Sequence, residues 1–457
     1  MARIKRAPEE IPDEQHEQVF ERVCAIDVAK QFGQVCVRTP RADGKRASTV
    51  FAVDATTRDI LKLGESLLEQ GIEMITLEST SDYWRIFYYL LEGCGLRVQL
   101  VNARDVKHVP GRPKTDKHDC VWSAKLTERG MLRPSFVPPH EVRVLRDYTR
   151  TRVDLTRDRT RHWQRLEKLL EDALIKVTTV ASKITTMSVR DMIDALIRGE
   201  RDPEALADLA RGVMRDKRRD LVRALDGRFD DHHGELAKIL LGQIDSLTAE
   251  IDRLTTRIEQ LVNELPTPEH PVDPGGDTTP PSGSATDTQP DPAPRPTLQR
   301  LADIPGINLA AAQAILAEIG LDMNRFQTPK HLVAWARLTP QVFQSGTKSR
   351  GGKTSKGNPY LKGVLGTAAA SAARSNTFLG ERYRRIVKRR GKGKALVAVA
   401  RSILVIVWHL LANPNAEYHD LGADYYETRI DKERRKRHLI QQLEALGLQV
   451  TLTPAAA

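Results

Sequence analysis

Several protein classes are excluded by what this sequence lacks. It has no uninterrupted run of 18 apolar residues among its 457, so we expect no membrane-spanning helix. The charged first ten residues are not followed by a hydrophobic stretch of the signal-peptide type, so secretion is not expected. Its four cysteines form no C-x-x-C pair, which argues against a zinc site and against a disulfide framework. A reducing cytoplasm is the compartment that fits best.

Positive charge is concentrated in one part of the chain. The net charge is +11, yet residues 341–401 hold 15 Lys or Arg against the single acid Glu381, a local charge of +14. Such a confined basic excess is typical of a surface that binds a polyanion, most simply nucleic acid, through its phosphates. The candidate contacts are Lys348, Arg350, Lys353, Lys356, Arg384, Arg385, Arg389 and Arg390.

Composition divides the chain into six parts. Residues 266–296 hold ten of the 25 prolines and no aromatic residue, which predicts an extended linker. We expect an N-terminal extension at 1–19, a catalytic domain at 20–135, a helical coiled-coil region at 136–265, the linker at 266–296, a mainly α-helical C-terminal domain at 297–412 and a charged helical tail at 413–457.

A heptad pattern precedes the linker. Leu or Ile recurs with alternating spacings of four and three from Leu240 to Leu265, as in a coiled coil. A second helix is predicted at about 141–177, so the two form either an antiparallel hairpin within one chain or a dimerisation element. The polar, helix-prone residues 178–234 between them have no role that the sequence reveals.

The first 130 residues have a different pattern. Short β-type runs at 23–27, 33–39 and 48–53 precede a helix (57–70), a strand (72–78), a helix (82–92), a strand (96–101) and a helix from about 115. This βββ-α-β-α-β-α order is that of the ribonuclease H fold, an α/β fold with a mixed sheet.

Four acids fall at informative places in this order. Asp27 ends the first strand, Glu78 ends the fourth, and Asp116 and Asp119 are three residues apart on the last helix. Carboxylates that converge at strand ends repel one another unless cations lie between them. We therefore predict a site for Mg²⁺ or Mn²⁺ with two ions, suited to phosphoryl transfer. Taken singly, each acid could equally be a solvated turn residue or a helix cap.

The same residues resemble a known family. AIDVAK at 25–30, LEST at 77–80 and KTDKHDC at 114–120 are similar to the DEDD motifs of insertion-sequence transposases of family one-ten, related to Piv-type DNA invertases. The resemblance implies an N-terminal domain like the Holliday-junction nuclease RuvC. Ala25 stands where glycine is commoner and Cys120 where alanine is, but neither change affects a carboxylate.

The C-terminal half resembles the same family. LADIPGI at 301–307, before an Ala-rich helix, predicts a helix-hairpin-helix-like element that contacts phosphate. A Pro-Gln stretch, Ser345-Gly346 and a Ser-Lys-Gly-Asn segment at 355–358 are similar to the family's C-terminal transposase domain. The resemblance implies that Ser345 is the nucleophile, with Ser349 and Ser355 as alternatives.

Three functions follow as hypotheses. The first is a transposase or site-specific recombinase that cuts and rejoins donor and target DNA through a phosphoserine bond, with the four acids holding the metal. The resemblance implies guidance by a structured noncoding bridge RNA, a homo-oligomer from dimer to tetramer, and action at the bacterial nucleoid. The second is a RuvC-like metal-dependent nuclease or junction resolvase that uses water as nucleophile. The third is a non-catalytic nucleic-acid-binding protein.

Overall fold

The computed structural model describes residues 20–79, 81–102, 116–265, 295–340, 342–345, 348–352, 354, 356–428 and 432–451. For 116–117, 342–345, 348–351, 427, 432–435 and 438 it describes the backbone alone. The chain divides into two compact units, residues 1–137 and 138–457. The N-terminal extension at 1–19 and nearly all of the predicted linker lie outside the described residues.

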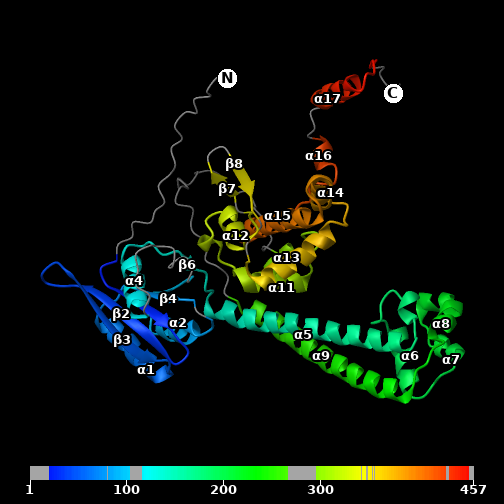
Figure 1. Cartoon of the computed structure of the whole chain (residues 1–457), viewed down its shortest axis with the longest axis horizontal. Coiled ribbons are helices and arrows are strands. Elements are labelled where there is room, and N and C mark those ends of the chain that lie inside the picture. Colours follow the sequence, from blue (N-terminus) through cyan, green and yellow to red (C-terminus); the bar gives the residue numbers. More distant parts are fainter. Residues whose placement is uncertain are drawn as a thin grey trace, which may run out of the picture. The chain divides into compact units, whose positions relative to one another are not determined.

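A six-stranded mixed sheet forms the centre of the first unit, in the order β3-β2-β1-β4-β5-β6 (Figure 1). Strands β1, β4 and β5 are parallel, and β2, β3 and β6 run antiparallel to their neighbours. The predicted order of strands and helices is found, with β6 as an addition, and the arrangement is compatible with a ribonuclease H-like domain. The strands are β1 (Val23–Val28), β2 (Phe32–Pro40), β3 (Arg46–Asp54), β4 (Met74–Glu78), β5 (Val98–Val101) and β6 (Pro134–Ser135).

Helices cover both faces of this sheet. Helices α1 (Thr57–Glu69) and α2 (Trp84–Gly93) pack on one face, where Ile26, Leu77 and Phe87 belong to one buried cluster. Helix α4 (Asp116–Glu128) packs on the other face, where Ala25 and Cys120 belong to a second cluster. Because side chains of a strand alternate between its faces, β1 and β2 contribute to both clusters.

Two long helices dominate the second unit. Helices α5 (His140–Asp172) and α9 (Asp231–Asn263) pack side by side, with Leu145 beside Ile258 at one end and Leu170 beside Leu241 at the other, so they are antiparallel (Figure 1). Within the heptad pattern, the isoleucines at 244, 251 and 258 are buried, and the leucines at 240, 247, 254 and 261 are partly exposed. Of the two predicted alternatives, the structure has the antiparallel hairpin within one chain. Pairing between chains stays a prediction.

The residues between these two helices form a packed helical element. Its members are η1 (Val177–Thr179), α6 (Met187–Ile197), α7 (Pro203–Asp208), η2 (Gly212–Lys217) and α8 (Arg218–Leu225). Met192, Leu206 and Leu221 share a buried cluster with Leu170 and Leu241 of the long helices. The polar, helix-prone segment 178–234, for which the sequence reveals no role, is therefore a folded cap at the end of the hairpin.

The C-terminal part is mainly helical. Its elements are α10 (Thr297–Ala302), α11 (Leu309–Ile319), η3 (Met323–Arg325), α12 (Pro329–Trp335), β7 (Val342–Ser345), β8 (Lys348–Gly351), α13 (Pro359–Ala372), α14 (Phe378–Arg390), α15 (Lys392–Ala412), α16 (Tyr425–Thr428) and α17 (Lys432–Ala445). Between α10 and α11, Gly306 has a φ of +91°, and a Cβ there would lie 2.2 Å from the carbonyl oxygen of Ala368. The predicted turn is thus packed against α13, while its contact with phosphate stays a prediction.

Helix α15 is an exception to the statement that the sequence holds no segment apolar enough to span a membrane. Among the described residues it is one helix long and apolar enough to cross a membrane by length and composition alone. Eight of its residues are buried, among them Val399, Ile403 and Val407, and it packs against α12, α13 and α14. Its place in the fold is that of a core helix.

Candidate functional site

Asp27 and Glu78 lie at the same end of two adjacent parallel strands. Ile26 of β1 pairs with Leu77 of β4, and the next residue of each strand is the acid. Parallel neighbouring strands lie about 4.8 Å apart, so the two acids are close neighbours. Both side chains are partly exposed, which leaves the pair accessible to solvent.

The alternation of the strands places both acids on the face that α4 covers. Ala25, two residues before Asp27, packs with Cys120 of α4. Thr76, two residues before Glu78, has its Oγ1 2.7 Å from the Oγ1 of Thr127, also on α4. Since residues i and i+2 share a face, Asp27 and Glu78 follow these contacts onto the α4 side.

Helix α4 runs opposite to β1 and brings its first turn to the acids. The N–H of Phe20, before β1, donates to the carbonyl of Glu128 at the end of α4. Near the other end of both elements, the Sγ of Cys120 lies 3.9 Å from the carbonyl oxygen of Ala25. The start of α4 therefore lies at the carboxyl ends of the strands. Asp119 is there with a partly exposed side chain, and Asp116 begins the helix, with only its backbone described.

The electrostatics of Cys120 agree with this placement. A hydrogen bond with Cys36 and burial raise the pKa of the Cys120 thiol, and the negative charge of Asp27 raises it further. The Cys36 thiol has a lowered pKa because of the same hydrogen bond. Asp27 therefore lies near enough to α4 for its charge to act on the residue next to Asp119.

The donor set of this site fits a hard divalent cation. Its candidate ligands are carboxylate oxygens, which suit Mg²⁺ or Mn²⁺ and not a soft metal. The acids come from two strand ends and from the first turn of a helix. Asp27, Glu78, Asp116 and Asp119 would hold the ions, and their roles remain a proposal.

Ser345 lies in a two-stranded hairpin of the second unit. Strands β7 and β8 are antiparallel, and Ser345 at the end of β7 is paired with Lys348 at the start of β8. Ser349 is opposite Gln344. Ser345 is therefore next to the turn, directly opposite a basic residue in the register. Lys353 and Ser355 lie outside the described residues.

Comparison with known proteins adds an independent finding. A family model described as "Transposase" matches residues 24–175, and a model described as "Transposase IS116/IS110/IS902 family" matches residues 298–384. The chain belongs to the IS110 family of transposases. Among curated proteins, 118 residues are 30% identical to the transposase for insertion sequence element IS1111A of Coxiella burnetii (strain RSA 493 / Nine Mile phase I). That alignment covers 25% of this chain and 32% of the relative, so the chain spans about a third of the relative's length.

The two matches cover both candidate centres of this IS110-family transposase. The first includes Asp27, Glu78 and the whole of α4, and the second includes Ser345 and its hairpin. Helix α5 lies within the first match, whereas α9 and the folded cap before it lie outside both. Neither match assigns a role to an individual residue.

The predicted basic surface is partly engaged within the fold. Arg384 donates to Glu381 at 2.9 Å, and the guanidinium of Arg385 lies 4.5 Å from the centre of the Tyr426 ring. Arg389 and Arg390, at the end of α14, are exposed, as is Lys356 before α13. Arg389, Arg390 and Lys356 therefore remain accessible to a phosphate backbone, whereas Arg384 and Arg385 also stabilise the fold. Of Lys348 and Arg350 only the backbone, in β8, is described.

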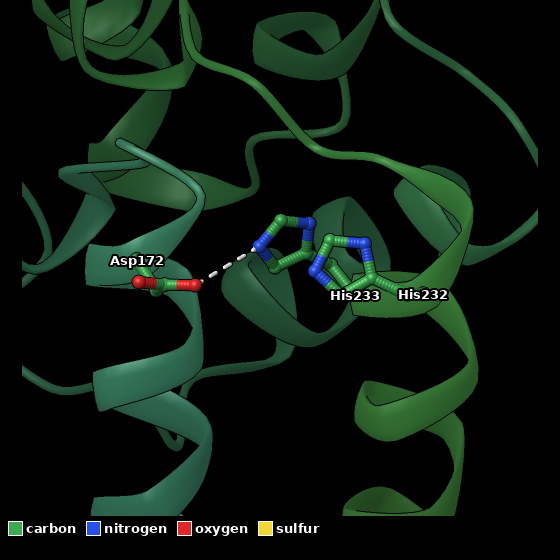
Figure 2. Close-up of side chains that lie close together, drawn as sticks. All are labelled: Asp172, His232 and His233. Atoms are coloured by element: carbon green, nitrogen blue, oxygen red, sulfur yellow. Dashed lines mark hydrogen bonds and ion pairs between the residues drawn. The ribbon is translucent and has the colours of Figure 1, made fainter.

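A group that sequence reasoning missed lies at the end of the long hairpin. Asp172, His232 and His233 have possible ligand atoms within 4.8 Å of one another (Figure 2). However, Nδ1 of His233 accepts a hydrogen bond from the N–H of Asp230 at 3.1 Å, so in the neutral ring Nε2 carries the proton and faces Asp172 at 3.4 Å. A nitrogen that carries a proton has no lone pair for a metal. The group is better explained as the N-terminal cap of α9, in which His233 also contacts α5.

Proposed function

We propose that this chain is a DNA recombinase of a mobile element, which cuts and rejoins DNA through a covalent phosphoserine bond at Ser345. The observation that carries the proposal is the placing of Asp27, Glu78 and the first turn of α4 at one end of the sheet, in a chain of a transposase family. A nuclease fold alone would explain the acids. The serine-bearing segment within the second family match favours the recombinase.

The chemical step is a transesterification at phosphorus. The Ser345 Oγ gives up its proton and attacks a phosphodiester, the P–O bond to one sugar breaks, and the leaving sugar oxygen takes up a proton to become a hydroxyl. Mg²⁺ held by Asp27, Glu78, Asp116 and Asp119 would stabilise negative charge on the attacking and leaving oxygens. In the backbone register of the hairpin, Lys348 is the residue paired with Ser345. Because the ester energy is kept in the phosphoserine, a second sugar hydroxyl can reverse the step and rejoin the strand.

The partners follow from the same proposal. The substrates are donor and target DNA, contacted through the exposed arginines of α14 and through Lys356. A bridge RNA would supply sequence recognition by base pairing, and a dimer or tetramer would bring two DNA segments together. The site of action is then the nucleoid in the cytoplasm.

A covalent adduct tests the proposal. Purified protein is incubated with element DNA, element-derived RNA and Mg²⁺, and a denaturation-resistant protein–DNA adduct is sought. We expect an adduct with wild type and with Ser349→Ala, and none with Ser345→Ala or Asp27→Asn. Metal-dependent cutting without an adduct, retained in Ser345→Ala, would favour the alternative of a nuclease that uses water. DNA binding without any cutting would favour the non-catalytic reading.

A further inference from the structure

Glu318 is an unusual residue for its position. It lies in α11, whose sequence LAAAQAILAEI is otherwise almost wholly apolar, and only 1% of its surface is exposed. Burying a carboxylate is unfavourable unless it is paired and hydrogen-bonded. A buried acid in such a helix therefore requires specific partners.

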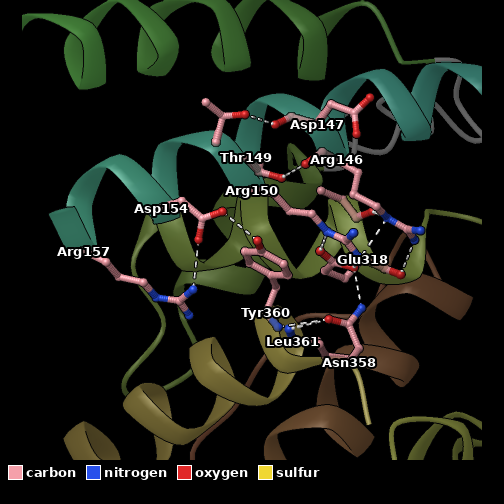
Figure 3. A network of polar contacts seen from close by, with 12 residues as sticks. Arg146, Asp147, Thr149, Arg150, Asp154, Arg157, Glu318, Asn358, Tyr360 and Leu361 are labelled. Atoms are coloured by element: carbon pink, nitrogen blue, oxygen red, sulfur yellow. Dashed lines mark hydrogen bonds and ion pairs between the residues drawn. The ribbon is translucent and has the colours of Figure 1, made fainter. Parts of the chain in front are cut away.

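Two arginines of α5 bind this carboxylate. Arg150 donates to both of its oxygens, from Nε at 2.7 Å and from a terminal nitrogen at 2.9 Å, in the bidentate geometry typical of strong pairs (Figure 3). The Nε of Arg146 lies 3.4 Å from the Oε2 of Glu318. Arg146 also donates to the backbone carbonyls of Ala317 and Glu318 at the end of α11. Burial alone would lower the pKa of Arg150, but the hydrogen bond and charge of Glu318 raise it. Helix α11 is thus fixed to α5 through Glu318.

The third partner comes from the start of α13. The side-chain amide of Asn358 donates to Glu318, while its Oδ1 accepts from the backbone N–H groups of Tyr360 and Leu361 at 3.0 and 3.2 Å (Figure 3). Asn358 therefore caps α13 with one side-chain atom and holds Glu318 with the other. Tyr360 adds a second link, because its hydroxyl donates to Asp154 of α5 at 2.7 Å.

Asn358 is also where the chain returns from the serine hairpin. A Cβ on the preceding Gly357 would lie 2.9 Å from the carbonyl oxygen of Ala336, so the two backbones are in direct contact. Ala336 follows α12, and Leu338 beyond it is buried at the point where the chain leaves for β7. Both ends of the segment that carries Ser345 therefore meet at one place, next to Glu318.

From this arrangement we propose that Glu318 is a positioning residue for Ser345, which fixes the base of the serine hairpin to α5 through its bond with Asn358. The proposal rests on the proposed function, in which Ser345 is the nucleophile. It predicts that breaking the Glu318–Asn358 bond slows attack on DNA without weakening DNA binding, since neither side chain belongs to the basic surface.

Exchanging the carboxylate of Glu318 and the amide of Asn358 between the two positions gives the decisive experiment. Asn358→Asp keeps the cap of α13 but removes the donor and places two carboxylates face to face. Glu318→Gln removes the buried charge. The double variant Glu318→Gln/Asn358→Asp restores the hydrogen bond between the two side chains with donor and acceptor reversed, while the new amide group at Oε2 loses the bond from the terminal nitrogen of Arg150.

The measurements are the rate of covalent adduct formation at saturating DNA and, separately, the Kd for DNA. We expect each single variant to lose about 10- to 100-fold in rate, as for a misplacement of about 1 Å, with the Kd unchanged. The double variant should react faster than either single variant, because it regains the bond between the two side chains. The matched control is Asp208→Asn, which removes a carboxylate that binds Arg218 on the exposed surface and should keep the wild-type rate.

The outcomes separate the two proposals. An adduct that persists in Ser345→Ala overturns the proposed function whatever Glu318 does. If Ser345→Ala abolishes the adduct but the single variants react at the wild-type rate, the role of Glu318 is overturned. A double variant no faster than the singles also overturns it, because the loss then comes from the buried charge alone. Should Glu318→Gln fail to fold, Asn358→Ser, which keeps the cap and loses only the bond, decides by the same rate.

Discussion

Replacing Asp27 with Asn is expected to stabilise the metal-free protein and to remove its response to Mg²⁺. The pairing of Ile26 with Leu77 places Asp27 and Glu78 about 5 Å apart on neighbouring strands. Carboxylates separated by about this backbone spacing repel by about 3 kcal/mol at an effective dielectric constant of about 20. Both side chains are partly exposed and solvent screens them, so about 1 to 3 kcal/mol remains.

Thermal melting of the full chain measures this effect. At about 4 °C per kcal/mol for a unit of this size, the first unit of Asp27→Asn should melt about 4 to 12 °C higher than wild type in EDTA. Excess Mg²⁺ should raise the melting temperature of wild type, because a ligand that binds only the folded state stabilises it, and should leave the variant nearly unchanged. Asp54→Asn, an exposed aspartate at the end of β3 in the same sheet, is the control and should match wild type in both buffers.

Two results would refute this reasoning. A variant that melts at or below the wild-type temperature in EDTA would mean that Asp27 and Glu78 do not repel each other in the folded state. A variant that Mg²⁺ stabilises as much as wild type would mean that Asp27 is not a ligand.

Three further predictions concern the rest of the fold. Burial raises the pKa of Cys24 and three of the four cysteines are buried, so a thiol reagent at pH 8 should modify only Cys94 rapidly; a second fast thiol would contradict the burial. Arg190 binds Asp245 with two hydrogen bonds and lowers the pKa of that carboxyl, so its stabilisation is present at neutral pH and lost as pH falls through the lowered value. Arg190→Ala should therefore cost about 0.5 to 1 kcal/mol in urea unfolding at pH 7, and this cost should shrink as the pH falls through the lowered pKa of Asp245; a cost that does not change with pH would contradict the pairing. Arg300 donates to three carbonyls at the end of α15 and beyond it, so Arg300→Met should lower stability by about 2 to 4 kcal/mol, and an unchanged urea midpoint would show that those carbonyls find other partners.

The sheet could be predicted because its sequence signals are local. The apolar run from Val23 to Ile26 forms the buried part of strand β1, and turn residues separate β1, β2 and β3 from one another. The acids could be located because each lies at or near the end of such an element. Strand β6 was missed since two residues carry no periodicity, and its partner Leu100 lies far away in the sequence.

Long-range polar contacts could not be predicted. The sequence around Glu318 indicates an apolar core helix, and nothing local shows that Arg146 and Arg150, about 170 residues earlier, supply its counter-charges. The folded cap at residues 178–234 was missed for a related reason. Its apolar residues are spread among many charged ones, and they form a core only when Leu170 and Leu241 close it from the long helices.

The geometry of the hairpin explains why a residue at its base can control chemistry at its tip. Strand β7 runs from Val342 to Ser345, so at about 3.3 Å per residue Ser345 is about 10 Å from the start of the strand. A tilt of about 5° at the base then moves the serine by about 1 Å, a displacement that can cost about a hundredfold in rate. A surface contact near the tip would be mobile and screened by water. A buried carboxylate bound by two arginines and by the cap of α13 resists tilting at the place where a small angle has the largest effect.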